Sequence, residues 1–226
     1  FREASFTFND EESQRLDAFA KSQQTTLNTV MHLAWGYLLH RYSGENDVVF
    51  GTVISGRPAE VTRIEEMIGL FINAIPVKIS FGDEANTGAL LGRIQRAFQE
   101  SQQFGFLPLP EVQRQSRVRA GEPLFDTVMA FENYPLETAL SSDDARPRPF
   151  EIEKSTAEEG RTNYKLVMVA SYRTNLKLRC DYRSDEFSAE TIARLLEHLE
   201  HHRRAALLRP RIRIEPPVGH EFAAAV

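Results

Sequence analysis

Residues 47–58 read Asp-Val-Val-Phe-Gly-Thr-Val-Ile-Ser-Gly-Arg-Pro, and the fold prediction starts from them. The first eight residues are mostly β-branched or aromatic, which is typical of a strand buried on both faces inside a sheet. The Ser-Gly-Arg-Pro run then ends the strand, because glycine and proline interrupt regular structure. We therefore predict a central strand over 47–54 that opens into a loop.

A short strand and a helix are predicted at the start of the chain. Alternating apolar and polar residues favour a strand within residues 1–8. Asn9, followed three positions later by Glu12, has the pattern of a capping box, so the first helix begins there. Thr25 or Thr26 is expected to cap a second helix, because threonine side chains accept bonds from the first free amides.

This second helix is predicted to be the most buried one. Its apolar residues recur with the 3.6-residue period of a helix face. Gly44 follows in the position where helices commonly end. The residues of the predicted face are Leu27, Val30, Met31, Ala34, Trp35, Leu38 and Leu39.

A second strand is predicted over Leu70–Ser80, after a helical turn between Glu60 and Met67. Pro76 within it favours an edge strand or a bulge, because proline lacks the N–H that a ladder needs. Thr87–Gln103 then has the period of an amphipathic helix, and a short helix is expected to begin near Leu109. The apolar face of the longer helix is predicted to contain Leu90, Leu91, Ile94, Ala97 and Phe98.

The last part of the chain favours strands before a final helix. Residues 125–131 are predicted as a strand, and 164–170 with 176–182 as a hairpin. Residues 141–149, polar and proline-containing, are expected to form a mobile connector. Ser188 is expected to cap the final helix. Because helices and strands alternate while the late strands form a hairpin, we predict an α/β sandwich with a mixed sheet.

Composition excludes several classes of protein. The 226 residues carry a formal net charge of -5, which argues against a bulk nucleic-acid binder. No apolar run approaches the roughly 20 residues that cross a bilayer, and no basic-then-apolar leader is seen. Cys180 is the only cysteine, so disulfides and thiolate zinc sites within one chain are excluded. We expect a cytoplasmic protein without a membrane contact.

No complete catalytic constellation is visible in the sequence. The chain contains no Gly-x-Gly-x-x-Gly, no Gly-Lys-Ser/Thr phosphate loop and no Gly-x-Ser-x-Gly elbow. His198, His201 and His202 share a helix face, but we interpret them as solvated side chains rather than metal ligands. Cys180 falls in a strand pattern and is expected to be a buried, inert thiol. His220 lies in the tail, so we do not consider it a candidate catalytic or metal-binding residue.

Two motifs give the sequence a resemblance to a known family. Residues 50–58 and 66–77 are similar to two segments of the condensation domains of nonribosomal peptide synthetases. The first is a strand ending in Ser-Gly-Arg-Pro, and the second is Ile/Val-Gly-x-Phe-Ile/Val-Asn-Thr-x-Pro. Residues 107–113, 123–127 and 131–135 resemble three further motifs of that family. The resemblance runs in the right order from about residue 5 to residue 205.

Departures from the family pattern indicate which part of the domain the chain contains and which type of domain it resembles. The family's His-His-x-x-x-Asp-Gly motif, which lies in its N-terminal lobe, does not occur in this sequence. Ala74 replaces the usual threonine, and Gln102 stands where the family usually has His or Asn before Gln103. Epimerization domains share the fold but tend to carry Trp-Phe-Thr where this chain has 71–73. Asn73 therefore favours a condensation domain.

The resemblance implies a fold and a reaction. Residues 1–208 would be the C-terminal lobe of a two-lobed, chloramphenicol-acetyltransferase-like domain, and 209–226 a linker, tail or cloning remnant. In such a domain, donor and acceptor peptidyl carrier proteins bind on opposite faces and their phosphopantetheine arms meet between the lobes. The acceptor amine attacks the donor thioester and forms a peptide bond. The implied partners are the N-terminal lobe, both carriers and an adjacent adenylation domain, with no cofactor bound directly.

The resemblance also implies supporting residues rather than catalytic ones. Ser55, Gly56, Arg57, Pro58 and Asn73 would face the tunnel or substrate, with Asn73 either bonding substrate, holding the loop or bonding its own backbone. The floor of the tunnel would contain Ile68, Gly69, Leu70, Phe71 and Ile72. Residues 131–149 would cross to the other lobe. A basic cluster that is either a solvated face or a contact for the phosphate of the carrier arm consists of Arg114, Arg117 and Arg119.

Without its histidine-bearing lobe, the chain is expected to be inactive alone. Two alternatives remain open. The chain could be a non-catalytic docking module for carrier proteins, or a lobe of a related acyltransferase that needs a partner's histidines. The amino acids joined and the chirality of the donor do not follow from the sequence.

Overall fold

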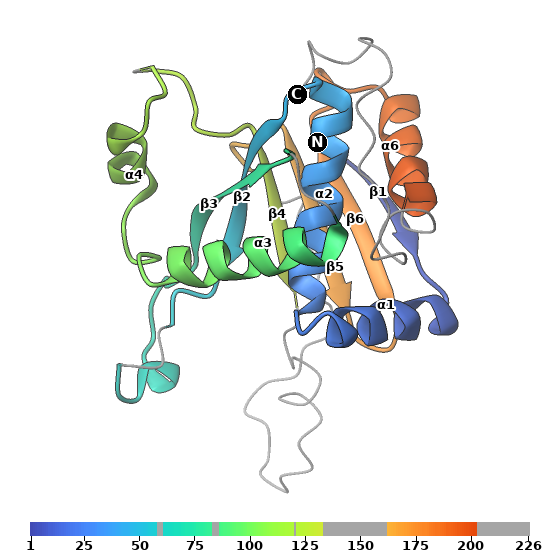
Figure 1. Ribbon diagram of the computed structural model, residues 1–226. Helices are drawn as coiled ribbons and strands as arrows, with labels where there is room; N and C mark the ends of the chain where they lie inside the picture. Colours follow the sequence, from blue (N-terminus) through green and yellow to red (C-terminus); the bar gives the residue numbers. More distant parts are fainter. Residues whose placement is uncertain (58–60, 83–85, 120, 133–161, 203–226) are drawn as a thin grey trace, which may run out of the picture.

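A six-stranded mixed sheet, in the order β1-β6-β5-β4-β2-β3, organises the chain (Figure 1). The computed structural model describes residues 1–57, 61–82, 86–119, 121–132 and 162–202. The pairs β2–β4 and β4–β5 are parallel, and the other pairs are antiparallel. This confirms the predicted mixed sheet. The strands are β1 Arg2–Thr7, β2 Asp47–Ile54, β3 Asn73–Ser80, β4 Thr127–Glu132, β5 Leu166–Tyr172 and β6 Leu176–Tyr182.

The helices that cover the sheet gather around α2. This helix contacts α1, α3 and α6 as well as β2 and β4, while α3 also contacts β3 and α6 also contacts β1. Figure 1 shows α2 and α3 in front of the sheet, with α1 across its lower end. The helices are α1 Asp10–Ser22, α2 Leu27–Ser43, α3 Thr87–Gln102, α4 Leu109–Gln115 and α6 Ala189–His202, with a 3₁₀ turn, η1, over Ile64–Glu66.

The predicted helix caps are confirmed. Asn9 and Glu12 form the reciprocal capping box of α1, with the Glu12 amide donating to Asn9 Oδ1 over 2.9 Å. Thr26 rather than Thr25 caps α2. Gly44 ends that helix in the left-handed conformation, with φ +76°. Since these capping contacts lie within a few residues of chain, local chemistry alone places the helix ends.

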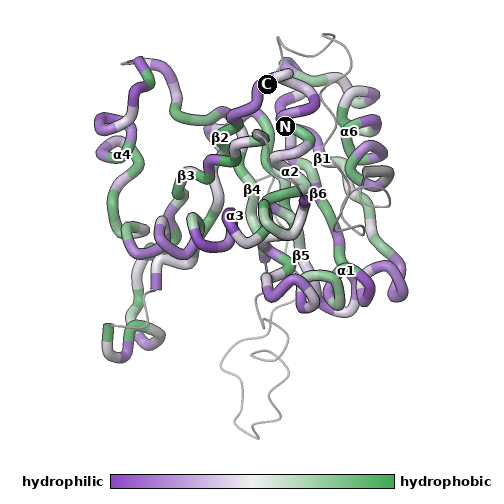
Figure 2. Tube along the Cα trace, in the orientation of Figure 1, coloured by the Kyte–Doolittle hydropathy of each residue, from purple (hydrophilic) through white to green (hydrophobic). Residues whose placement is uncertain are grey.

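Two parts of the chain stand away from the sheet and its helices. One is the connection between β2 and β3, whose described residues 61–72 we call the projecting segment; the other is α4 (Figure 1). Figure 2 shows hydrophobic residues recurring along the projecting segment. The sequence predicted a strand from Leu70, but β3 begins at Asn73, so the prediction for 70–72 is wrong. Those residues have no neighbouring strand to pair with among the described residues.

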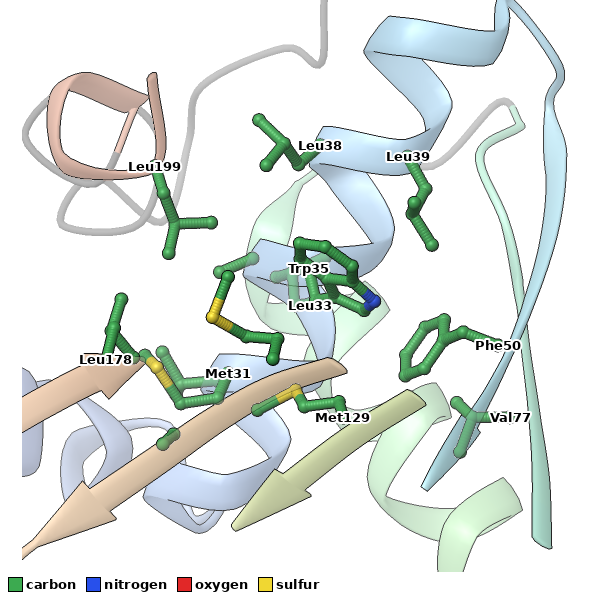
Figure 3. Close-up of a cluster of buried hydrophobic side chains, with 14 of the residues drawn as sticks. Met31, Leu33, Trp35, Leu38, Leu39, Phe50, Val77, Met129, Leu178 and Leu199 are labelled. Carbon is green, nitrogen blue, oxygen red and sulfur yellow. The ribbon is translucent and has the colours of Figure 1, made fainter. Parts of the chain in front are cut away.

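One continuous core lies between the helices and the sheet. Phe50 of β2 and Val77 of β3 are paired residues, and both face α2 (Figure 3). Trp35 and Leu39 of α2 point toward them from the other side. All four side chains are buried. The prediction that α2 is the most deeply buried helix fits this position, since nearly every side chain from 27 to 40 is inaccessible.

A few local predictions differ from the structure. The strand predicted from Phe125 begins at Thr127. Ala97, predicted on the buried face of α3, is exposed, while the other four residues of that face are buried. Pro76 lies on the edge strand β3, as predicted. The predicted connector 141–149, the tail 209–226 and most of the predicted crossing segment 131–149 fall outside the described residues.

Candidate functional site

The candidate site lies where β2 ends and β3 begins. Ile54 and Asn73 are the last paired residues of the two strands, so the chain leaves the sheet here and returns to it. Three segments meet at this corner: residues 55–57, the projecting segment, and the turn after α3, residues 104–107, which we call the aromatic loop. Pro58, predicted to face the tunnel, lies outside the described residues.

Gly56 allows two parts of the β2–β3 connection to touch. Its φ of +62° is a left-handed conformation that side chains rarely adopt. A Cβ at this position would collide with the carbonyl oxygen of Phe71. Gly56, which the resemblance placed facing the tunnel or substrate, thus lets the chain after β2 pass close to the projecting segment of the same connection.

Arg57 binds the projecting segment. Its guanidinium donates to the carbonyl oxygen of Ile64. Both of its terminal nitrogens also donate to the carbonyl oxygen of Met67, at N···O distances of 3.1 Å. The same group lies over the ring of Phe71, 4.3 Å from the centroid. The side chain is half-buried. Its donors therefore reach the carbonyl oxygen of the first residue of the turn η1 and that of the residue just after the turn.

Asn73 joins the start of β3 to the aromatic loop. Its Nδ2 donates to the carbonyl oxygens of Gly105 and Leu107, over 2.7 and 2.9 Å. Its Oδ1 accepts a bond from the amide of Ala74 over 2.9 Å. Two of the roles that the sequence left open, holding a loop and bonding its own backbone, are thus both present. These bonds occupy both Nδ2 protons.

The aromatic loop lies against the end of β2 and presents two rings outward. A Cβ at Gly105 would collide with the side chain of Ile54, so the loop backbone packs directly on the strand end. Phe104 and Phe106 are exposed on either side of that glycine. Because burying exposed phenylalanine rings against another surface is favourable, the two rings mark a surface suited to binding a partner.

The projecting segment exposes apolar side chains to a greater degree. Ile68 is 103% exposed and Leu70 is 92% exposed, as much as in an extended chain. Ile72 and Met67 are also exposed, whereas Phe71 is half-buried under Arg57. The predicted floor residues therefore divide into outward-facing apolar side chains and one ring that packs inward.

The predicted arginine cluster is separate from the projecting segment. Arg114 belongs to α4 and pairs with Glu111 over 3.1 Å, and Arg117 and Arg119 are exposed in the following loop. In Figure 1 α4 lies far from η1. The structure therefore does not bring α4 together with the projecting segment.

The remaining candidate groups have structural surroundings. Burial raises the pKa of the Cys180 thiol to about 12, which keeps it protonated and unreactive. His198 is exposed and bonds the hydroxyl of Tyr42 over 2.9 Å through Nδ1. Among the described residues, no group of three or more His, Cys, Asp or Glu side chains is arranged to hold a metal ion. None of the described helices is long and apolar enough to cross a membrane.

The sequence prediction missed a buried polar pair. His32 of α2 is fully buried, and its Nε2 lies 2.9 Å from the Thr52 hydroxyl of β2. Burial lowers the pKa of His32 to about 3, so the imidazole is neutral. The available signal was the helix itself, because a helix that is apolar on nearly every side buries all its residues.

The corner has the chemistry of a shaped surface rather than of an acid–base centre. Its polar side chains, Arg57 and Asn73, bond backbone carbonyls, while its outward-facing side chains are apolar. Such an arrangement can fix a contour and bury apolar area against a partner.

Comparisons with known proteins agree with this geometry. A family profile described as "Condensation domain" matches residues 2–216. One of the linear gramicidin synthase proteins of Brevibacillus parabrevis is 33% identical over 199 residues, 88% of this chain. The chain spans only 4% of the length of that relative.

Solved structures share the fold. A four-domain nonribosomal peptide synthetase bound to AMP and glycine superposes with a TM-score of 0.79 at 17% identity, covering 94% of this chain and 17% of its own. The first condensation domain of the CDA synthetase gives a TM-score of 0.73 at 15% identity, covering 96% of this chain. The chain thus spans about half of that solved domain, 47%.

Proposed function

The chain belongs to the condensation-domain family, and on that premise we propose that it is the C-terminal lobe of a peptide-bond-forming condensation domain. In the proposed reaction, the amine of a carrier-bound acceptor attacks the thioester carbonyl of a carrier-bound donor. A C–N bond forms, the C–S bond breaks, and the donor carrier keeps its free phosphopantetheine thiol. The lobe would occupy residues 1–208, with 209–226 as a linker or tail.

One observation carries the proposal. Nearly all of this chain superposes on a solved condensation domain, yet it accounts for only 47% of that domain. This share supports one lobe of two. The order of the Ser-Gly-Arg-Pro and Gly-x-Phe-Ile-Asn segments supports the C-terminal one.

The corner at the end of β2 would border the tunnel between the lobes. Residues 55–58 and Asn73 would line its wall, and residues 68–72 would form its floor and reach the N-terminal lobe. The exposure of Ile68 and Leu70 supports this placement, because apolar side chains in water favour burial against a partner. The exposed basic cluster of Arg114, Arg117 and Arg119 would meet the phosphate of a carrier arm.

In this proposal the lobe contributes positioning rather than proton transfer. Holding the two thioester-bearing arms in a productive geometry can contribute on the order of 7–11 kcal/mol to lowering the barrier in favourable cases. The histidines of the other lobe would orient or deprotonate the amine. The chain alone would therefore form no amide, and it would act beside both carriers and an adenylation domain.

The test is reconstitution with loaded carriers. The reading frame upstream of Phe1 is first examined for His-His-x-x-x-Asp-Gly, and that segment is produced separately. We expect no amide from this chain alone, and amide formation when both segments are mixed. Amide formation by the chain alone would contradict the proposal. If the chain binds the carriers but no amide forms, either with the chain alone or with both segments mixed, the docking-module alternative would be favoured.

A further inference from the structure

The projecting segment keeps its shape with little apolar packing of its own. Ile64 is buried, but the side chains at 68 and 70 are almost wholly in water. The turn η1 contains three backbone bonds, from the amides of Ile64, Glu66 and Met67, and such a short turn is marginal by itself. The segment's own ion pair, Arg63 with Glu66, is solvent-exposed and adds little, so contacts from outside the segment supply most of its order.

Arg57 supplies those contacts from the end of β2. Its donors reach the carbonyl oxygens of Ile64 and Met67, so they bind the turn at its first residue and just after its last. Its guanidinium plane also covers the Phe71 ring, beyond the exposed pair Ile68 and Leu70. One side chain thus touches the segment on both sides of the residues that point outward.

The chemistry of this contact requires an arginine. A guanidinium has five N–H donors in a rigid plane, which allows it to bond two carbonyl oxygens and to stack on a ring at the same time. A lysine ammonium is a point charge without a plane, so it cannot reproduce both contacts. Gly56, whose backbone touches the Phe71 carbonyl, completes the base of the segment.

We propose that Arg57 is a positioning residue that fixes the path of residues 64–71 and thereby the directions of Ile68 and Leu70. Its effect on condensation, which rests on the proposed function, passes through this segment. Arg57 would then make no direct contact with the substrate. This refines the expectation from the sequence, in which Arg57 faced the tunnel or substrate.

Amide hydrogen exchange in the purified chain tests this directly. In Arg57→Ala, the amides of Ile64, Glu66 and Met67 should exchange about tenfold faster or more, since charge-assisted bonds are lost. Arg57→Lys should lose most of the same protection. The β5–β6 hairpin is the internal control and should be unchanged in both variants. Unchanged exchange in Arg57→Ala, or equal acceleration in the hairpin, would overturn the proposal.

Chemical rescue separates positioning from general destabilisation. Guanidinium ion at tens of millimolar, well below denaturing concentrations, should restore part of the lost protection in Arg57→Ala. The same concentration of sodium chloride should not restore it, and neither salt should change the wild-type chain. Failure of guanidinium to restore any protection would count against a specific guanidinium site.

A kinetic measurement links the Arg57 contacts to the proposed reaction. In the reconstituted domain, Arg57→Lys should lower kcat for amide formation several-fold while KM for the loaded carriers stays within about twofold. A raised KM with unchanged kcat would instead indicate direct substrate contact and overturn the positioning role. If the wild-type domain forms no amide at all, the proposed function fails while the exchange result still decides the role of Arg57 in the segment.

Discussion

The α2–β2 region and the projecting segment both contain large apolar side chains, but the first region buries them and the second exposes them. Phe50 and Trp35 are completely enclosed between helix and sheet, whereas Ile68 and Leu70 extend into water. In the first region, apolar burial holds the chain in place. In the second, hydrogen bonds from Arg57 to backbone oxygens hold it, which leaves the apolar side chains free for another surface.

This contrast separates what stabilises the lobe from what serves its proposed function. Removing apolar atoms should be costly in the α2–β2 region and nearly neutral in the projecting segment. Changing backbone-directed contacts should have local effects at the end of β2. Substitutions in the two regions test this division, from the largest expected effect to the smallest.

Phe50→Ala and Leu70→Ala test the two regions with the same kind of truncation. Phe50 is 0% exposed in the core, so its loss should lower the free energy of unfolding by about 3–5 kcal/mol. Leu70→Ala should change it by less than about 0.5 kcal/mol. Urea unfolding followed by circular dichroism measures both. Similar losses in the two variants would remove the distinction between the regions.

Gly56→Ala and Gly44→Ala compare two glycines with positive φ. Both substitutions incur the left-handed backbone cost of about 1–2 kcal/mol. Nothing lies within 4 Å of a Cβ at Gly44, whereas at Gly56 it would collide with the Phe71 carbonyl. Gly56→Ala should therefore be about 1 kcal/mol more destabilising and should displace the projecting segment. Equal losses by urea unfolding would mean that the Phe71 contact adjusts without cost.

Burial of His32 makes the stability of the core depend on pH. Its folded-state pKa of about 3 lies below the unfolded value near 6.5, so only the unfolded chain gains this proton as the pH falls. The stability that the neutral His32 contributes to the folded state is fully present above pH 6.5 and is lost as the pH falls toward 3. The loss is about 1.4 kcal/mol per pH unit, which gives about 2 kcal/mol between pH 7 and pH 5.

Unfolding curves at several pH values isolate this term. His32→Leu should remove about that much of the pH dependence. An unchanged pH dependence in His32→Leu would show that the imidazole is not held neutral in the folded core.

Asn73→Ala is expected to have one of the smallest effects on the free energy of unfolding among these substitutions of buried or strained positions. It removes two bonds to the aromatic loop, and each partly buried bond contributes about 0.5–1.5 kcal/mol. We expect a loss of about 1–2 kcal/mol and faster proteolytic cleavage within residues 104–107. Gln103→Ala, an exposed neighbour, is the matched control. If cleavage rates match in the two variants, Asn73 does not order the loop.

The elements that local chemistry determines could be predicted from the sequence. Asn9, Thr26 and Gly44 mark helix ends within a few residues of themselves, and the apolar run of β2 identified its strand with the correct bounds. Residues 70–72 misled the prediction because an apolar run resembles a strand whether or not a neighbouring strand is present to pair with it.

The supporting contacts of the site could not be predicted in the same way. Asn73 bonds residues more than 30 positions later, and His32 bonds a residue 20 positions later on another element. Such pairs depend on how the helices and strands pack. The family motifs directed attention to the corner where β2 ends and β3 begins, but the partners of Arg57 and Asn73 became visible only in the folded chain.

Peroxide oxidation of the four methionines tests the central contrast most directly. Met67 lies in the projecting segment and is 44% exposed, whereas Met31, Met129 and Met168 are buried in the core. Under mild hydrogen peroxide, mass spectrometry of the folded chain should show Met67 sulfoxide forming at least about tenfold faster than sulfoxide at the other three. Oxidation of Met67 at the same rate as the core methionines would contradict the account of an apolar surface displayed outside the core.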